Sequence, residues 1–172
     1  MGNPRLDEWL VSNGHYKTRA RARDAIMRGC ISMAGDASIK PSRKVTDPES
    51  ITISDEAISL VSRAGLKLQA ALEETGYNPS GLNCVDLGAS TGGFCQVLLN
   101  HDAKRVFAID VGHDQMDETL KSNDRLVNLE GINARDLSLE TLDDTQPQFI
   151  TSDVSFISLR LALPPALEIA TS

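Results

Sequence analysis

The fold class of this 172-residue chain is decided by the stretch Asp86-Leu87-Gly88-Ala89-Ser90-Thr91-Gly92-Gly93. It follows the apolar residues Cys84 and Val85 and precedes an apolar repeat with helical spacing that begins at Phe94. The pattern predicts a strand, a glycine turn and a helix start, which together present backbone N–H groups to a nucleoside ligand. The dinucleotide fingerprint Gly-x-Gly-x-x-Gly is excluded, because Ser90 stands two positions after Gly88.

An acidic residue supports the nucleoside interpretation. Residues 104–109 form a second strand pattern that ends in Asp110. An acid at the end of the second strand, about 20 residues beyond the glycine turn, is placed to accept hydrogen bonds from ribose hydroxyls. The alternative is an ordinary glycine turn with Asp110 capping a loop. The two features together favour the nucleoside site.

The rest of the chain predicts an α/β fold class. A helix running through Leu68 and Leu72 ends at Gly76, and strand patterns then alternate with helices at 84–87, 104–109, 126–129 and 149–153. This alternation predicts a Rossmann-like, doubly wound parallel sheet, incomplete with strands 1–4. A small α+β domain precedes it. The expected domains are 1–57 and 67–172, joined by a linker at 58–66.

Charge is divided unevenly along the chain. The net charge is −7, yet residues 1–46 hold nine Lys/Arg against four Asp/Glu. A basic first part on an acidic body indicates a polyanion as partner, such as nucleic acid. The alternative is a solvated basic surface with no partner.

Other features exclude several classes of protein. The three cysteines form no Cys-x-x-Cys pair, which favours reduced core residues, and the three histidines are too scattered for a metal site. No apolar stretch is long enough for a membrane span, and no signal peptide opens the chain. We therefore expect a cytoplasmic protein with neither a membrane nor a metal partner.

The basic first part has its own pattern of elements. Apolar residues at 6, 9 and 10 predict a helix that stops near Asn13, and Thr18 is a candidate N-cap for a second helix reaching about Arg28. Short strands are expected at 31–33, 40–41, 45 and 51–53. Arg-Leu-Asp-x-x-Leu-Val (5–11), Thr-Arg-x-x-Ala-x-x-x-Ile-x-x-Gly (18–29) and the Lys-Pro turn together resemble the S-four RNA-binding domain. That resemblance implies RNA-phosphate contacts from Lys17, Arg19, Arg21, Arg23, Arg28 and Lys44.

The body resembles the methyltransferases that bind S-adenosylmethionine (SAM). Asp-x-Gly-x-x-x-Gly (86–92) is similar to their first motif. Ser-Arg-x-Gly-x-Lys-Leu (62–68), Ala-Ile-Asp-Val-Gly-x-x-Gln (108–115) and Ser-Asp-Val-Ser-Phe-Ile-Ser-Leu (152–159) extend the likeness. With the N-terminal domain, the chain resembles the TlyA (haemolysin A) family of ribosomal RNA 2′-O-methyltransferases from Arg5 onward. Ala64 departs from a commoner glycine, and Lys121 from a frequent arginine.

This resemblance implies an FtsJ-like catalytic domain with SAM as cofactor and ribosomal RNA or ribosomal subunits as partner. The family's Lys-Asp-Lys-Glu set matches Lys67 and Asp153 as catalytic residues. The cofactor pocket matches Asp86, Gly88, Ala89, Ser90, Gly92, Gly93, Asp110 and Asn133. A lysine beside a carboxylate can position the ribose hydroxyl for in-line methyl transfer without a metal.

The family's second lysine and glutamate lie beyond Ser172, and the second lysine is the expected general base. We therefore expect a C-terminally truncated chain that is inactive alone, as a fragment of a longer protein rather than a degenerate relative. The alternative function is a non-catalytic RNA-binding protein with a degenerate methyltransferase scaffold. A pseudouridine synthase lacks support because its Gly-Arg-Leu-Asp signature is missing from the body, and pore formation lacks a membrane-length segment.

Overall fold

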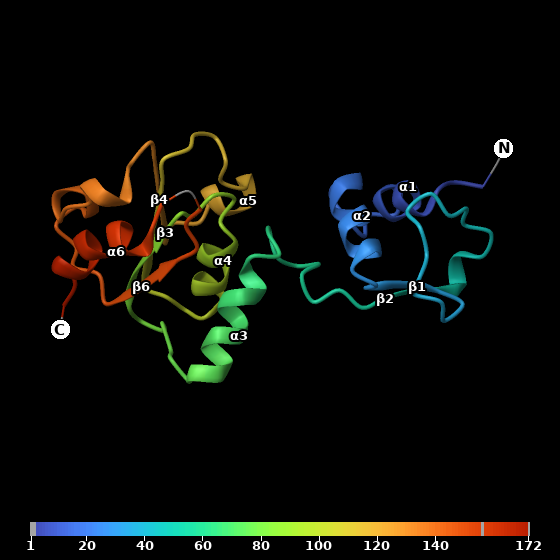
Figure 1. Cartoon of the computed structure of the whole chain (residues 1–172), viewed down its shortest axis with the longest axis horizontal. Helices are drawn as coiled ribbons and strands as arrows, with labels where there is room; N and C mark the ends of the chain where they lie inside the picture. Colours follow the sequence, from blue (N-terminus) through green and yellow to red (C-terminus); the bar gives the residue numbers. More distant parts are fainter. Residues whose placement is uncertain (1–2, 156, 172) are drawn as a thin grey trace. The chain divides into compact units, whose positions relative to one another are not determined.

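The structure is a computed structural model that describes residues 3–155 and 157–171 (Figure 1). Position 156 of the 152–159 motif lies outside the described residues. The chain divides into two compact units, Met1–Ser59 and Leu60–Ser172. The division falls within residues 58–66, where the sequence predicts a linker.

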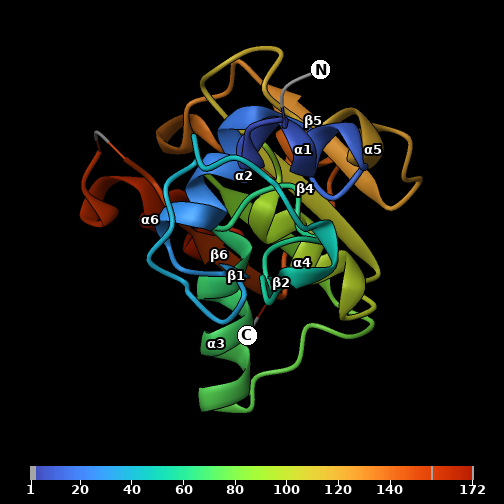
Figure 2. The same ribbon diagram turned by 90° about the vertical axis from the view of Figure 1, so that its right-hand side faces the viewer.

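The N-terminal unit combines two helices with a short hairpin. Helix α1 spans Leu6–Ser12 and α2 spans Arg19–Met27, and both lie beside the antiparallel pair β1 (Ile31–Met33) and β2 (Ile51–Ile53) (Figure 2). A single 3₁₀ turn, η1 (Pro48–Ser50), leads into β2. The Thr18 side chain accepts a hydrogen bond from the Arg21 N–H, as expected of an N-cap.

Two of the predicted short strands are wrong. Residues 40–41 lie in a turn, and Val45 belongs to no strand, although its neighbour Lys44 forms an isolated bridge with Arg5. The segment is held instead by its backbone, since the Leu6 N–H donates to the Arg43 carbonyl and the Val45 N–H to the Pro4 carbonyl. Apolar residues of this segment still enter the core, where Ile39 and Val45 pack with α1 and α2.

A parallel sheet forms the centre of the C-terminal unit. Its strands are β3 (Asn83–Leu87), β4 (Arg105–Asp110), β5 (Leu126–Glu130) and β6 (Phe149–Ser152), in the order β5-β4-β3-β6. Every recorded pairing is parallel. The chain moves outward from β3 to β5 and then returns to the other side of β3. Such a reversal opens a crevice at the carboxyl ends of the strands, where ligands bind.

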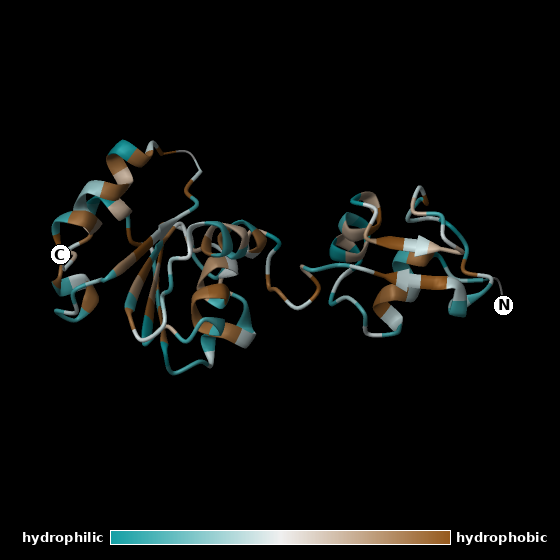
Figure 3. Cartoon of the chain, turned by 90° about the horizontal axis from the view of Figure 1, so that it is seen from below, coloured by the Kyte–Doolittle hydropathy of each residue, from teal (hydrophilic) through white to brown (hydrophobic). Residues whose placement is uncertain are grey.

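Layers cover both faces of the sheet (Figure 1). One face packs against α3 (Gly65–Thr75), α4 (Gly93–Asn100) and α5 (Glu118–Lys121), and the other against α6 (Leu159–Glu168) and the 3₁₀ turns η2 (Ala134–Asp136) and η3 (Glu140–Leu142). Along β4, Val106 faces the first layer and Phe107 the second, following the two-residue period of a strand. Hydrophobic residues mark these strands in Figure 3.

Two glycines let α3 and α4 approach closely. A Cβ on Gly65 would lie 2.9 Å from the Gly93 carbonyl oxygen and 3.2 Å from Val97. Conversely, a Cβ on Gly93 would lie 3.1 Å from the Gly65 nitrogen. The first turn of α3, which carries Lys67, is therefore fixed against the start of α4. The helix ends at Gly76, whose φ of 71° is the left-handed conformation that glycine tolerates.

Candidate functional site

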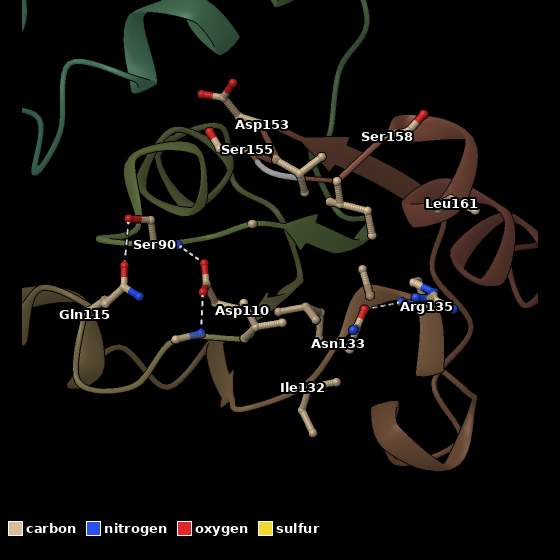
Figure 4. Close-up of a pocket in the computed structure, with 17 residues that line it drawn as sticks. Ser90, Asp110, Gln115, Ile132, Asn133, Arg135, Asp153, Ser155, Ser158 and Leu161 are labelled. Atoms are coloured by element: carbon tan, nitrogen blue, oxygen red, sulfur yellow. Dashed lines mark hydrogen bonds between the residues drawn. The ribbon is translucent and has the colours of Figure 1, made fainter.

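A cavity of about 750 Å³ lies at the carboxyl end of the sheet (Figure 4). Its volume is in the range of ligand pockets, about 300–1,000 Å³. The loops after β3, β4, β5 and β6 all contribute to its walls, which places it in the crevice that the strand order opens. The lining residues are Gly88, Ser90, Ile109, Asp110, Val111, Gly112, Gln115, Ile132, Asn133, Ala134, Arg135, Asp153, Val154, Ser155, Ile157, Ser158 and Leu161.

Asp110 joins two of these loops. One carboxylate oxygen accepts the Ser90 N–H at 2.8 Å, and the other accepts the Gly112 N–H at 2.7 Å. Each carboxylate oxygen can accept a further hydrogen bond. Asp110 is therefore held rigidly while keeping acceptor capacity for a pair of ligand hydroxyls.

The glycine turn contributes to the cavity unevenly. Gly88 and Ser90 line it, both with positive φ, whereas Ala89, Gly92 and Gly93 are not among the lining residues. A Cβ on Gly88 would lie 3.0 Å from the Val154 side chain, so this glycine permits close packing against the loop after β6. Gly92 faces α5, where a Cβ would lie 2.5 Å from Leu120. These residues shape the turn rather than the cavity wall.

Asp86 lies beneath the turn instead of in the cavity wall. Its side chain is buried and accepts hydrogen bonds from Thr151 Oγ1 at 2.9 Å and Cys95 Sγ at 3.2 Å. Burial raises the pKa of Asp86 to about 6, although the two hydrogen bonds act in the opposite direction and lower the pKa. The structure therefore places Asp86 as an internal support that connects β3, α4 and β6.

Lys67 and Asp153, predicted as a catalytic pair, meet at the cavity. The Lys67 ammonium lies 2.7 and 2.9 Å from the two carboxylate oxygens of Asp153, although 86 residues separate them in the chain. Their side chains are 65% and 37% exposed. Ion pairs this exposed contribute little to stability, so the pair is poorly explained as a structural device.

Asn133 also lines the cavity, and in Figure 4 it lies on the other side of Asp110 from Gln115. Its side-chain oxygen accepts the Arg135 N–H at 3.0 Å and so begins the turn η2. Neighbouring Ile132 and Ala134 supply apolar surface to the same wall. The arrangement suits the flat face of a nucleobase.

Val111 and Gln115 are among the wall residues to which the sequence-based prediction gave no role. Val111 follows Asp110 and is 65% exposed, which is unusual for an apolar residue at the end of a buried strand. Gln115 belongs to the quoted 108–115 motif, but its spacing gives no sign that it turns back toward Ser90, whose hydroxyl lies 3.1 Å from its side-chain oxygen. Both residues belong to the 108–115 motif, but neither the exposure of Val111 nor the contact of Gln115 with Ser90 is visible in the sequence.

In the N-terminal unit, buried Asp7 organises several of the predicted RNA-binding residues. Its carboxylate lies 2.9 Å from Arg5, 3.1 Å from Arg19 and 3.8 Å from Arg23. The hydrogen bond from Arg5, with help from Arg19, lowers the pKa of Asp7 to about 2. Arg19 and Arg23 remain about half exposed, at 51% and 59%.

The remaining predicted RNA contacts differ in their surroundings. Arg28 lies 2.8 Å from Asp24 and 3.1 Å from the buried carboxylate of Asp55, and only 27% of its side chain is exposed. Arg21 donates to the Ala57 carbonyl at 3.1 Å. Lys17 and Lys44 lie on the surface. The structure thus ties Arg21 and Arg28 to residues 55–57, the last part of the N-terminal unit, rather than to Asp7.

A doubly wound parallel sheet with an acidic strand end and a nucleoside-sized cavity defines the class of Rossmann-like α/β proteins. Comparison with known families refines this class, since the FtsJ-like methyltransferase family matches residues 60–171. The chain belongs to the FtsJ-like methyltransferase family.

Named relatives agree with this assignment and confirm the resemblance to the TlyA family. The chain is 42% identical to Hemolysin A of Brachyspira hyodysenteriae over 160 residues, 93% of this chain and 66% of that protein. It is 38% identical to the 16S/23S rRNA (cytidine-2′-O)-methyltransferase TlyA of Mycobacterium tuberculosis over 161 residues, 93% and 60% of the two proteins. A solved structure described as a hemolysin from Streptococcus thermophilus superposes with a TM-score of 0.68 at 35% identity, covering 99% and 63% of the two chains.

The chain thus spans roughly three fifths to two thirds of the length of these relatives. Within residues 3–155 and 157–171, no helix has the length and apolar character needed to cross a membrane. Across the same described residues, no group of three or more His, Cys, Asp or Glu side chains is arranged to hold a metal ion.

Proposed function

We propose that the protein transfers a methyl group from SAM to a ribose 2′-hydroxyl of ribosomal RNA. The observation that carries this proposal is the Lys67–Asp153 ion pair at the edge of the nucleoside-sized cavity. An exposed pair adds little stability, but a cation and a carboxylate beside a bound nucleoside can orient a second ribose. The relative from Mycobacterium tuberculosis carries the name of a cytidine-2′-O-methyltransferase, which supports the same reaction.

The residues of the cavity suit SAM. Asp110 can accept hydrogen bonds from the two ribose hydroxyls, because each of its oxygens has acceptor capacity beyond its backbone partner. Val111 and Ile132 provide apolar contacts for an adenine, and Gly88 and Ser90 border the part of the cavity beside the glycine turn that would take the amino-acid part of the ligand. Bound SAM would supply an electrophilic methyl group on a positively charged sulfur.

The ion pair has a defined part in this proposal. Asp153 accepts a hydrogen bond from the target 2′-hydroxyl and orients its oxygen toward the methyl carbon. Lys67 holds the Asp153 carboxylate at 2.7 Å and attracts the adjoining phosphate of the RNA. Formation of the new O–C bond would be matched by cleavage of the S–CH3 bond, which leaves S-adenosylhomocysteine, and the hydroxyl proton would leave to a base. The second lysine of the TlyA set is the expected base, and this step belongs to the whole protein.

The N-terminal unit has a separate part. We propose that it holds ribosomal RNA through phosphate contacts from the half-exposed Arg19 and Arg23, with Lys17 and Lys44 further out. Contacts to phosphates supply affinity and orientation without reading the base sequence, and they weaken steeply with salt. All four arginines bind acceptors within the unit, but Arg28 contributes less because only 27% of its side chain is exposed, against 51% and 59% for Arg19 and Arg23.

Two measurements on the full natural protein test the proposal. Calorimetric titration with S-adenosylhomocysteine, the product of methyl transfer, should show one site per chain. Transfer of labelled methyl groups from SAM to ribosomal RNA should then be lost in Lys67→Met and kept in Lys104→Met, a matched change just before β4 at the opposite end of the sheet. If the wild-type protein binds RNA but neither SAM nor its product, the non-catalytic RNA-binding alternative replaces the methyltransferase.

A further inference from the structure

Glu130, the last residue of β5, binds the backbone of the loop that follows β4. One carboxylate oxygen accepts the Asp114 N–H at 2.7 Å, and the other accepts the Gln115 and Met116 N–H groups at 3.2 and 3.4 Å. The Asp114 hydrogen bond, followed by one from the Asn128 side chain and by the two other backbone bonds, lowers the pKa of Glu130 to about 2, so the carboxylate is charged at all ordinary pH values. Three consecutive backbone donors thus converge on one side chain that does not itself line the cavity.

The same loop is held at two further points. A Cβ on Gly131 would lie 2.6 Å from the His113 ring, so the imidazole packs directly over this glycine. At the other end of the loop, the Asp117 N–H donates to the Thr91 carbonyl at 3.2 Å, within the glycine turn. The loop therefore spans from the end of β5 to the turn after β3 and forms one rim of the cavity.

This anchoring determines where the Gln115 side chain lies (Figure 4). Its oxygen lies 3.1 Å from the Ser90 hydroxyl, and its amide nitrogen lies so close to Gly112 that a Cβ there would overlap it. Gly112 and Ser90 are also the two residues whose N–H groups bind Asp110. The Gln115 amide is thus positioned on the same wall as the acid proposed to bind the ribose.

We propose that Glu130 is a positioning residue of the nucleoside site: by binding the backbone of residues 114–116 it holds the Gln115 amide against the ribose side of the bound ligand. Gln115 is then a direct ligand contact and Glu130 acts through it. The inference rests on the proposed cofactor, because it names the parts of the cavity that recognise the same nucleoside.

The test is a double-mutant cycle in the full natural protein, with S-adenosylhomocysteine as the titrated probe. Glu130→Gln keeps the side-chain shape but loses the charge, and we expect binding to weaken about tenfold, close to the loss of one charge-assisted hydrogen bond. Gln115→Ala should weaken binding to a similar extent. If Glu130 acts through Gln115, the double variant should bind no more weakly than the weaker single variant.

Two further variants serve as a matched control and as a second perturbation of Gln115. Glu118→Gln is the matched control, because Glu118 is 85% exposed and pairs only locally with Lys121, and its affinity should equal that of the wild type. Gly112→Ala pushes aside the flexible end of Gln115 at a backbone φ that is not positive, but its Cβ would also lie 3.1 Å from a carboxylate oxygen of Asp110. It should therefore weaken binding at least as much as Gln115→Ala, even if the Glu130 variant fails to fold, and wild-type affinity in Gly112→Ala would contradict the Gln115 contact.

An amide NMR measurement separates positioning from general destabilisation. The short bond to Glu130 should shift the Asp114 amide proton downfield, and Glu130→Gln should move it upfield while amides of β3 stay in place. Wild-type affinity in Glu130→Gln, or losses of binding free energy that are fully additive in the double variant, would overturn the role proposed for Glu130 but leave the proposed function intact. No binding by the wild-type protein would overturn the proposed function together with it.

Discussion

Replacing Asp86 with asparagine should stabilise the protein at alkaline pH. The substitution keeps the size of the side chain and one acceptor oxygen for Thr151 or Cys95, but removes a carboxyl that must lose its proton inside the protein. An ionised carboxylate without a cationic partner is costly to bury, and no basic residue is among its recorded hydrogen-bond partners.

The magnitude follows from the pKa of Asp86, about 6 in the folded protein against 3.8 for an ordinary aspartate. A shift of roughly 2 units corresponds to about 3 kcal/mol in the free energy of unfolding. Because the folded-state pKa of Asp86 is raised, the wild-type protein has this contribution to its free energy of unfolding in full below pH 3.8 and loses it as the pH rises through 6. Asparagine does not titrate. The stability of Asp86→Asn relative to the wild type should therefore rise between about pH 4 and pH 7 and stay constant above pH 7.

Urea unfolding followed by circular dichroism at several pH values from 4 to 8 measures this difference. Asp144→Asn is the matched control, because Asp144 is exposed in a loop with a positive φ that asparagine also tolerates. The control should change stability little, and by the same amount at every pH. A difference between Asp86→Asn and the wild type that does not vary with pH would refute the reasoning, as would a less stable variant at pH 8.

Three other substitutions test separate parts of the molecule. Lys67→Met should lower methyl transfer by about 100-fold or more, since misplacing the reacting groups by about 1 Å can cost that much. The same substitution should change the free energy of unfolding by less than about 1 kcal/mol. An equal loss of activity in Lys104→Met would contradict the role proposed for Lys67. Gly65→Ala places a Cβ 2.9 Å from a backbone oxygen of α4 and should cost about 1–3 kcal/mol in urea unfolding; unchanged stability would show that the helices can separate without penalty. Asp7→Asn should lower the free energy of unfolding by about 2 kcal/mol at pH 7. Because the pKa of Asp7 is lowered in the folded protein, the difference from the wild type should vanish as the pH falls from about 4 to about 2. A loss that persists at pH 2 would mean that packing rather than charge is responsible.

The secondary structure followed from local signals in the sequence. Thr18 begins α2 and Gly76 ends α3 because capping depends on neighbouring residues alone. The apolar runs became parallel strands in the expected chain order, and Asp110 lies at the end of β4 as predicted. The likeness to FtsJ-like methyltransferases added what periodicity could not, namely that Lys67 and Asp153 should be considered together.

Tertiary contacts explain what the sequence did not reveal. Asp86 opens the glycine motif, but a two-residue alternation cannot show that its side chain lies under the turn against Cys95. Glu130 reads as an ordinary acid at the end of a strand, and its three backbone partners come from a loop with no periodic pattern. The sequence suggests that Arg28 is an exposed cation, but its guanidinium binds the carboxylate of Asp55, which lies 27 residues later in the chain. Each of these contacts depends on the folded path of the chain.

The way the cavity is assembled has a consequence for protein synthesis. Its walls come from the loops after β3, β4, β5 and β6, so no continuous segment contains them all. Lys67 leaves the ribosome 86 residues before its partner Asp153, and the glycine turn at 88–93 leaves about 60 to 65 residues before it. Until β6 pairs beside β3, a growing chain has neither a closed nucleoside site nor the ion pair. An enzyme acting on ribosomal RNA would therefore leave the ribosome unable to modify that RNA. It could gain this ability only after β6 has paired with β3.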